Sequence, residues 1–301
     1  MPILVTGSHR SGTTWVGRML ALPPVLRYVH EPFRPDASHD LVPLPTKRWY
    51  EYIPSNGENE RYRVKLEKGL GLRYPLGHHL KASGSLRDGY RHVRSAVGRT
   101  IDRWRGRSVL LKDPLALLSA EWLYEQFDLD VVVMIRHPVA FAGSLKVKGW
   151  TFPFQDLLDQ SRAMKDLFWE HREEIQHFAK TDQHIVDQAA LLWTLLYNVV
   201  LKYRKQQPDW VFLRHEDIAR SPLQTFQGLY DQFGLDFTNT VRSQIEAHSD
   251  PAEKKSTVED LQRDSESVIR NWVQRLTADE IKRVRKRTAS VASEFYSEDE
   301  W

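Results

Sequence analysis

Short apolar runs alternate along the chain with longer segments in which apolar residues recur at helical spacing. Four of the runs are bounded by polar or turn residues, as buried parallel strands are: residues 3–6, 108–111, 130–135 and 210–213. Helical periodicity is clearest in five segments: residues 14–22, 119–127, 154–178, 187–206 and 223–233. This alternation predicts an α/β fold with a central parallel sheet and helices on both faces.

Two regions depart from the alternation. Residues 36–106 form a basic, aromatic segment with glycine and proline turns, which we expect to be a largely helical insertion that covers the acceptor side of the active face as a lid. Near the other end, Thr277 and Glu280 are spaced as a capping box, which predicts a helix that reaches about Phe295. No linker rich in glycine, serine or proline divides the chain, so residues 1–301 are expected to form one domain.

A helix is expected near the end of the insertion. Five apolar residues fall on one face of it: Tyr90, Val93, Val97, Ile101 and Trp104. We expect this stripe to pack in the core. The arginines off the stripe and the aromatic residues earlier in the insertion support a second hypothesis, a surface that holds an anionic or glycosidic acceptor.

The amino-acid composition limits which kinds of binding or catalytic site the chain can form. The 43 basic and 40 acidic residues give a net charge of +3, so any anion site must be local. The chain has no cysteine, which excludes disulfides, thiolate metal sites and a cysteine nucleophile, and which fits a reducing, cytoplasmic setting. Residues 2–5 are too short for the apolar core of a signal peptide, and no later stretch approaches the apolar length of a membrane span. Peripheral membrane contact stays open, as does the oligomeric state.

The strongest local signal is the segment from Gly7 to Trp15, which follows an apolar strand and opens a helix. Such a turn directs backbone N–H groups, the helix dipole and the hydroxyls of Thr13 and Thr14 at one anionic group. The spacing of Gly7 and Gly12 also fits the first half of the nucleoside-triphosphate loop. Thr13, however, stands where that loop requires a lysine, so a kinase or NTPase is the weaker alternative.

The residues Ser11-Gly12-Thr13-Thr14-Trp15 resemble the 5′-phosphosulfate loop of the sulfotransferase superfamily, in which a basic residue precedes the serine. The resemblance implies a three-layer P-loop NTPase-like fold. It also implies that Arg10 to Thr14 bind the 5′-phosphosulfate of 3′-phosphoadenosine 5′-phosphosulfate (PAPS), that Trp15 stacks on adenine, and that PAP is the product. The acceptor is then a hydroxyl of a small molecule, with carbohydrate or lipid favoured, and no metal is needed.

Two further segments are similar to this family. Arg136 ends an apolar strand and Ser144 follows eight residues later, the spacing of the family's 3′-phosphate site. A guanidinium and a hydroxyl near a helix start can grip a phosphate together. His215 stands where the family places an adenine-contacting tyrosine, so the resemblance assigns it to the nucleotide. Arg263 and Ser265 receive no role.

The chemistry needs a base for the acceptor hydroxyl and positive charge at the leaving oxygen. Glu31, in a Glu-Pro pair like that of carbohydrate-type sulfotransferases, is the candidate base, and His30 is the alternative. We expect a buried pocket to raise the proton affinity of Glu31. Arg10 lies at the family's catalytic Lys/Arg position, and Lys112 follows a strand at the edge where open α/β sheets bind ligands.

A third class of function remains beside sulfo transfer and the kinase alternative. The basic insertion alone is typical of a non-catalytic polyanion-binding module, although nothing indicates a nucleic-acid partner. His78, His79 and His92 in the insertion lack the spacing of zinc ligands, so no metal site is expected.

Overall fold

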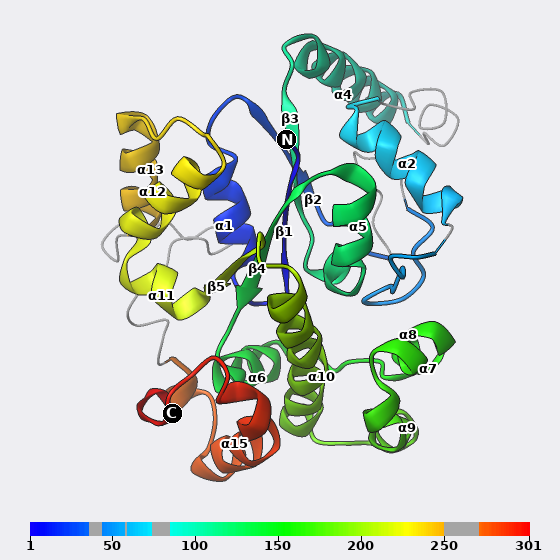
Figure 1. Cartoon of the computed structure of the whole chain (residues 1–301), viewed down its shortest axis with the longest axis vertical. Coiled ribbons are helices and arrows are strands. Elements are labelled where there is room, and N and C mark those ends of the chain that lie inside the picture. The colour runs from blue at the N-terminus through cyan, green and yellow to red at the C-terminus, as the bar shows by residue number, and fades with distance from the viewer. Residues whose placement is uncertain (36–43, 58, 74–84, 250–270) are drawn as a thin grey trace.

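A five-stranded parallel sheet forms the centre of the molecule (Figure 1). The computed structural model describes residues 1–35, 44–57, 59–73, 85–249 and 271–301. The sheet has the order β2-β3-β1-β4-β5, with the bounds β1 (Ile3–Gly7), β2 (Leu26–His30), β3 (Ser108–Lys112), β4 (Asp130–Ile135) and β5 (Val211–Arg214). The four predicted strands are confirmed, each within a residue or so of its expected bounds.

Side-chain alternation along the strands builds two cores. On β1, Leu4 belongs to one buried cluster, whereas Ile3 and Val5 belong to the other. The second cluster includes side chains of α1 (Thr13–Leu20), α12 (Pro222–Gln232) and α13 (Asn239–Ser249). The first includes those of α5 (Ala120–Phe127), α6 (Pro138–Lys148) and α10 (Ile185–Gln206). Helices therefore cover both faces, and the predicted three-layer α/β fold is confirmed.

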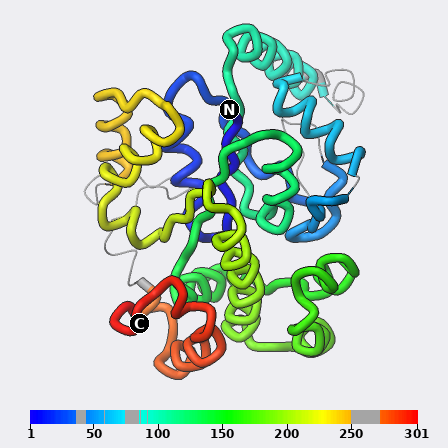
Figure 2. Tube along the Cα trace, in the orientation of Figure 1, coloured from blue at the N-terminus to red at the C-terminus, as the bar shows by residue number. Residues whose placement is uncertain are grey.

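The remaining elements surround these layers, as the Cα trace in Figure 2 shows. Their bounds are α2 (Glu60–Leu70), α4 (Leu86–Trp104), η1 (Pro114–Ser119), α7 (Gln155–Leu158), α8 (Ser161–Asp166), η2 (Trp169–His171), α9 (Arg172–Lys180), α11 (His215–Arg220), η3 (Asn271–Gln274), α15 (Ala278–Ala292) and η4 (Glu298–Glu300). The capping box of α15 is confirmed: Thr277 accepts from the Glu280 N–H at 3.2 Å, and the Glu280 carboxylate accepts from the Thr277 N–H at 2.7 Å.

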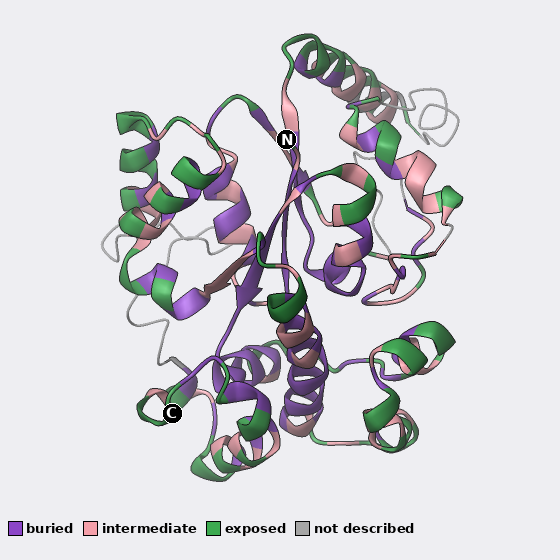
Figure 3. Cartoon of the chain, viewed as in Figure 1, coloured by how far each residue is buried: buried purple, intermediate pink, exposed green. Residues whose placement is uncertain are grey.

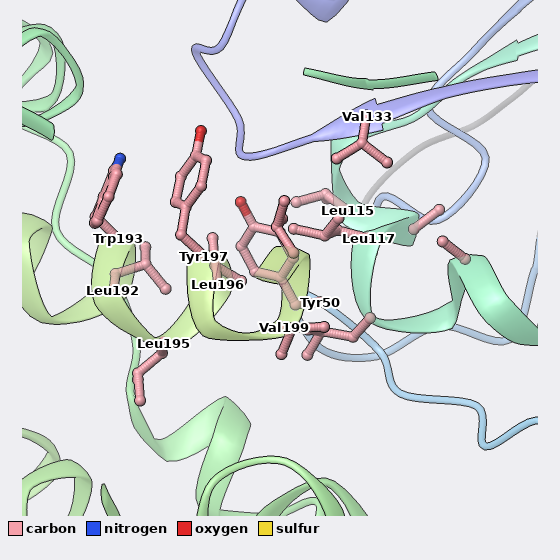
Figure 4. Packing of buried hydrophobic residues seen from close by; sticks show 14 of the residues in the cluster. Tyr50, Leu115, Leu117, Val133, Leu192, Trp193, Leu195, Leu196, Tyr197 and Val199 are labelled. Carbon is pink, nitrogen blue, oxygen red and sulfur yellow. The ribbon is translucent and has the colours of Figure 1, made fainter. Parts of the chain in front are cut away.

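Helix α10 is the central helix of the larger core (Figure 4). Its residues Leu192, Trp193, Leu196 and Tyr197 are fully buried. By length and composition α10 is apolar enough to cross a membrane, which corrects the expectation that no stretch approaches that length. The most apolar window of the helix is 72% buried inside the fold, however, so it serves as a core helix (Figure 3).

Two sequence predictions of secondary structure were wrong. The first missed β2, which lies at the edge of the sheet and is only partly buried. The second expected one helix over residues 154–178, where the chain forms α7, α8, η2 and α9. Tertiary contacts accompany the interruption: the side chains of Asp156 and Gln160 accept the backbone N–H groups of Trp49 and Tyr52, each at 2.8 Å.

The expectation that the apolar stripe of the insertion packs in the core was also wrong. The side chains of Tyr90, Val93, Val97, Ile101 and Trp104 on α4 are all exposed. The buried side chains of this helix are instead those of Arg99 and Asp102. His78, His79, Arg263 and Ser265 lie outside the described residues.

Tyr197→Phe tests how α10 is joined to the sheet edge. The Tyr197 hydroxyl accepts the buried N–H of Arg136 at 2.8 Å and bonds the Ser8 hydroxyl at 3.0 Å. Its removal leaves a buried N–H without its acceptor, so the free energy of unfolding should fall by about 1 to 3 kcal/mol in chemical denaturation. Tyr124→Phe is the matched control, because this half-buried tyrosine keeps its ring contact with Trp210. Equal losses in the two variants would contradict the assignment.

Candidate active site

The loop between β1 and α1 has the backbone of an anion cradle. Gly7 and Gly12 adopt φ values of 141° and 96°, which L side chains rarely adopt. A Cβ on Gly7 would collide with the Met134 carbonyl oxygen, and one on Gly12 would lie 2.5 Å from Nδ1 of His215. Gly12 is the N-cap of α1, and no side-chain hydrogen bond caps the helix there. The first N–H groups of α1 therefore point into the loop.

Neighbouring side chains hold this loop in place. Ser11 donates its hydroxyl to the carbonyl of Ser8 at 2.6 Å. The N–H of His9 donates to the Tyr50 hydroxyl at 3.0 Å, and Nδ1 of His9 lies 2.7 Å from the same oxygen. Burial, aided by the charge of Arg10, lowers the pKa of His9 to about 3, so its imidazole is neutral.

The segment after β4 joins the same loop. Arg136 donates from its guanidinium to the carbonyl oxygen of Arg10. Arg10 in turn donates from Nε to the Ser144 hydroxyl at 3.0 Å. Residues 136 and 144, paired in the sequence analysis by their spacing, are thus brought together through Arg10 at the carboxyl edge of the sheet.

Glu31 and Lys112 form an ion pair at the carboxyl ends of β2 and β3. His30 and Lys112 are paired in the strand register, and the Glu31 N–H donates to the Lys112 carbonyl at 2.8 Å. The backbone of Glu31 then turns into the left-handed region, with φ at 46°. The Lys112 ammonium donates to Oε1 of Glu31, and His30 Nε2 lies 3.8 Å from the same oxygen.

The electrostatics of this pair differ from the expectation for Glu31. Burial alone would raise the pKa of Glu31, but the charge of Lys112 and its hydrogen bond outweigh burial and hold that pKa below the ordinary value. Burial lowers the pKa of Lys112, and Glu31 opposes this only in part. The prediction of a raised proton affinity for Glu31 was therefore wrong, because sequence spacing did not show that Lys112 contacts it.

Asp113 is a buried residue that the sequence analysis left without a role. Its carboxylate accepts the N–H groups of Phe33 at 2.6 Å and Leu115 at 2.9 Å. Burial raises the pKa of Asp113 to about 7. Asp113 thus fastens the segment that carries Glu31 to the end of β3.

At the opposite end of the loop, Trp15 and His215 form an aromatic contact. Their ring centroids lie 6.1 Å apart in an edge-to-face arrangement, and Phe226 packs on the other side of Trp15 at 5.6 Å. These rings are where the resemblance places adenine, and the roles of Trp15 and His215 stay predictions.

One cavity of about 850 Å³ brings most of the predicted residues together. Ten of them line it: Arg10, Gly12, Thr13, Thr14, Trp15, His30, Glu31, Lys112, Arg136 and His215. Ser11 and Ser144 do not line it, although each bonds a loop residue. The other lining residues, which the sequence analysis did not assign to the site, include Arg18, Arg34, Lys148, Trp150 and Phe152.

A local signal existed for one of these missed residues. Trp150 follows Gly149, a left-handed C-cap with φ at 64°, directly after the helix that carries Ser144. A glycine at such a position marks a helix end near the expected phosphate site, so Trp150 could have been placed there.

The lid and metal expectations stay predictions. Of the insertion, Trp49 lines the cavity, whereas no described side chain of α4 does. Within the ranges that the structure describes, no three His, Asp or Glu side chains gather as a set able to hold a metal ion.

Solved structures of similar chains include three sulfotransferases. The sulfotransferase domain from the curacin biosynthetic pathway is 13% identical over 96% of this chain and 98% of that chain, with a TM-score of 0.46. STF9 from Mycobacterium avium is 15% identical over 99% and 77%, with a TM-score of 0.45. Mouse SULT7A1, solved in complex with PAP, is 10% identical over 99% and 86%, with a TM-score of 0.46.

Comparison with protein families gives the assignment. A search of the curated proteins finds no match to the chain. The model of the sulfotransferase family matches residues 2–239, a range that contains the whole sheet, the loop between β1 and α1, and every cavity residue named above. Since this match covers well over half of the sequence, the chain belongs to the sulfotransferase family, as its residues 11–15 predicted.

Proposed function

We propose that this sulfotransferase uses 3′-phosphoadenosine 5′-phosphosulfate as donor and transfers its sulfo group to a hydroxyl of a carbohydrate or lipid acceptor. The observation that carries the proposal is the single cavity lined by the β1–α1 loop, by Arg136 and by the Glu31–Lys112 pair. The same cavity thus offers one group for each of the two phosphates of the donor and a base for the hydroxyl of the acceptor.

The residues fit the donor. The first turn of α1 offers N–H groups for the 5′-phosphosulfate, and glycine at position 12 leaves room that a Cβ would fill. Arg136 would hold the 3′-phosphate, with Ser144 close by through Arg10. Trp15 supplies an aromatic face for adenine near His215.

The aromatic part of the lining suits an acceptor with an extended, partly apolar surface. Trp49, Trp150 and Phe152 line the cavity together with Glu31. Indole and phenyl rings stack on the apolar faces of sugar rings and on acyl chains, while Arg34 and Lys148 add positive charge.

The donor supplies an activated sulfo group: the acceptor oxygen bonds to sulfur as the bond from sulfur to the 5′-phosphate oxygen breaks, and the electron pair of that bond stays on the phosphate oxygen. Glu31 takes the proton of the acceptor hydroxyl. Lys112 and Arg10 place positive charge beside the leaving phosphate oxygen. His9, a residue of the loop itself, is neutral and adds no positive charge to the site.

Lys112 links the removal of the acceptor proton to the stabilisation of the leaving oxygen. While it is bonded to Glu31, the carboxylate is ionised and weakly basic. When the Lys112 ammonium turns to the leaving oxygen, burial is the largest remaining influence on Glu31 and raises its pKa against the smaller opposing charges of His30 and Arg34. The base then strengthens where transfer begins.

Arg136→Ala tests the donor site. The variant should bind adenosine 3′,5′-bisphosphate more weakly by about 1.5 to 3 kcal/mol, the range for hydrogen bonds to charged groups, which is roughly tenfold or more in calorimetry without metal. Its affinity for adenosine 5′-monophosphate should be unchanged, because that nucleotide lacks the 3′-phosphate. The exposed Arg242→Ala is the control. Equal loss for both nucleotides would mean that Arg136 only supports the loop, and tighter binding of ATP with magnesium would contradict the donor.

Lys112→Met tests the coupling through pH. The fall of kcat/KM at acid pH, its acid limb, reports protonation of the Glu31 base. Because the pKa of Glu31 is held below its ordinary value of 4.5, the activity of the native enzyme should persist until the pH falls below that value. Without Lys112, burial dominates and the acid limb should move above that value, while kcat falls by about 10²- to 10³-fold.

Two variants complete the pH experiment. Glu31→Gln should remove the limb and lower kcat by about 10²- to 10⁴-fold at unchanged nucleotide affinity. Lys148→Met removes another lysine of the cavity and should leave the limb in place. A limb that stays in Glu31→Gln would assign the base to another residue, with His30 next in line.

A further inference from the structure

Helix α4 exposes the apolar side of an amphipathic helix. The exposed fractions are 68% for Tyr90, 43% for Val93, 54% for Val97, 42% for Ile101 and 87% for Trp104. These residues are three or four positions apart and so form one continuous stripe along about four turns of the helix. Large apolar side chains gathered in one stripe mark a surface that binds something apolar.

The orientation of α4 is fixed from its polar side. Arg99 and Asp102 are 2% and 4% exposed. The Asp102 carboxylate accepts from Arg107 at 2.7 Å and from Arg27 of β2 at 3.3 Å. A rotation of α4 that buried the stripe would separate the Asp102 carboxylate from Arg27 and Arg107 and so break both ion pairs. The stripe therefore faces outward as a consequence of defined polar contacts.

A row of positive charge runs beside the stripe. Arg87, Arg94 and Arg105 are exposed, and they lie seven and eleven residues apart, close to whole helical turns. The acidic residues of α4 do not balance them, because Asp88 is engaged by Ser85 at the N-cap and Asp102 is buried. The partner of this surface must be apolar and negatively charged along the same line.

We propose that α4 lies in the surface of an anionic lipid bilayer, with the stripe in the acyl boundary and the arginines at the headgroups. Interfacial helices combine such a stripe with basic residues, and Tyr and Trp, here Tyr90 and Trp104, are enriched at headgroup depth. The helix lies at one end of the molecule, at the top of the view, where a flat lipid surface can approach it (Figures 1 and 3).

The test is sedimentation of the full chain with vesicles of phosphatidylcholine and phosphatidylglycerol in equal parts. The chain should sediment with these vesicles, much less with phosphatidylcholine alone, and less at high salt, because exposed charges are screened. The double variant Val97→Ser with Ile101→Ser should lose vesicle affinity by roughly tenfold or more. The matched control replaces two exposed valines elsewhere, Val25→Ser with Val273→Ser, and should bind as the native chain does.

A charge variant separates the two contributions. Arg87, Arg94 and Arg105 all changed to Gln should abolish the preference for anionic vesicles. Calorimetry with adenosine 3′,5′-bisphosphate accompanies each variant: unchanged nucleotide binding shows that the variant is folded. Vesicle binding without nucleotide binding in the native chain would overturn the proposed donor and leave this proposal standing.

Two results would overturn the membrane proposal. The first is a native chain that stays in solution with anionic vesicles. The second is a stripe that pairs copies of the chain: self-association in analytical ultracentrifugation that the Val97→Ser, Ile101→Ser variant abolishes, with vesicle affinity the same in variant and native chain.

Discussion

The hydroxyl of Tyr197 ties together the two loops on which the site is built. It bonds Ser8 of the loop after β1 and the backbone of Arg136 after β4, and Trp193, one turn earlier on α10, donates its indole N–H to the Arg136 carbonyl at 2.9 Å. The two rings stack at 4.3 Å and are fully buried (Figure 4). The polar ends of two core side chains on α10 thus fix the distance between Ser8 and Arg136, so the separation of the two loops is a property of the hydrophobic core.

The Glu31–Lys112 pair places a charged lysine side chain in the interior of the protein, where a charge costs free energy. The side chain of Lys112 is 1% exposed, and taking its ammonium out of water costs free energy. The ion pair with Glu31, which still lines the cavity, recovers only part of that free energy. The pair leaves Lys112 with a pKa held down by burial and Glu31 with one held down by its partner. In the proposed reaction this balance lets Lys112 turn from Glu31 to the anionic donor.

Sequence patterns predicted what depends on local repetition and missed what depends on distant contacts. Strands buried on both faces, such as residues 131–135, are apolar at every position and are easily seen. β2 carries Arg27 and His30 in five residues, because it is an edge strand with half-buried positions, and its pattern resembles a loop. The loop after β1 and Arg136 were both predicted as parts of a nucleotide site, whereas the hydrogen bond from Arg136 to the Arg10 carbonyl was not predicted. The pKa of Glu31 was not, since it depends on Lys112, which only strand pairing brings near.

Gly7 and Gly12 differ in the neighbouring atom that excludes a side chain. The atom that excludes a side chain at Gly7 is a backbone oxygen of Met134, so no substitution elsewhere makes room, and this glycine is fixed by the sheet itself. At Gly12 the obstacle is the imidazole of His215. A smaller residue at 215 would remove this clash, but the φ of 96° at Gly12 strains any L side chain whatever the space. Position 12 is therefore held to glycine twice, once by its own backbone and once by the imidazole that packs against it.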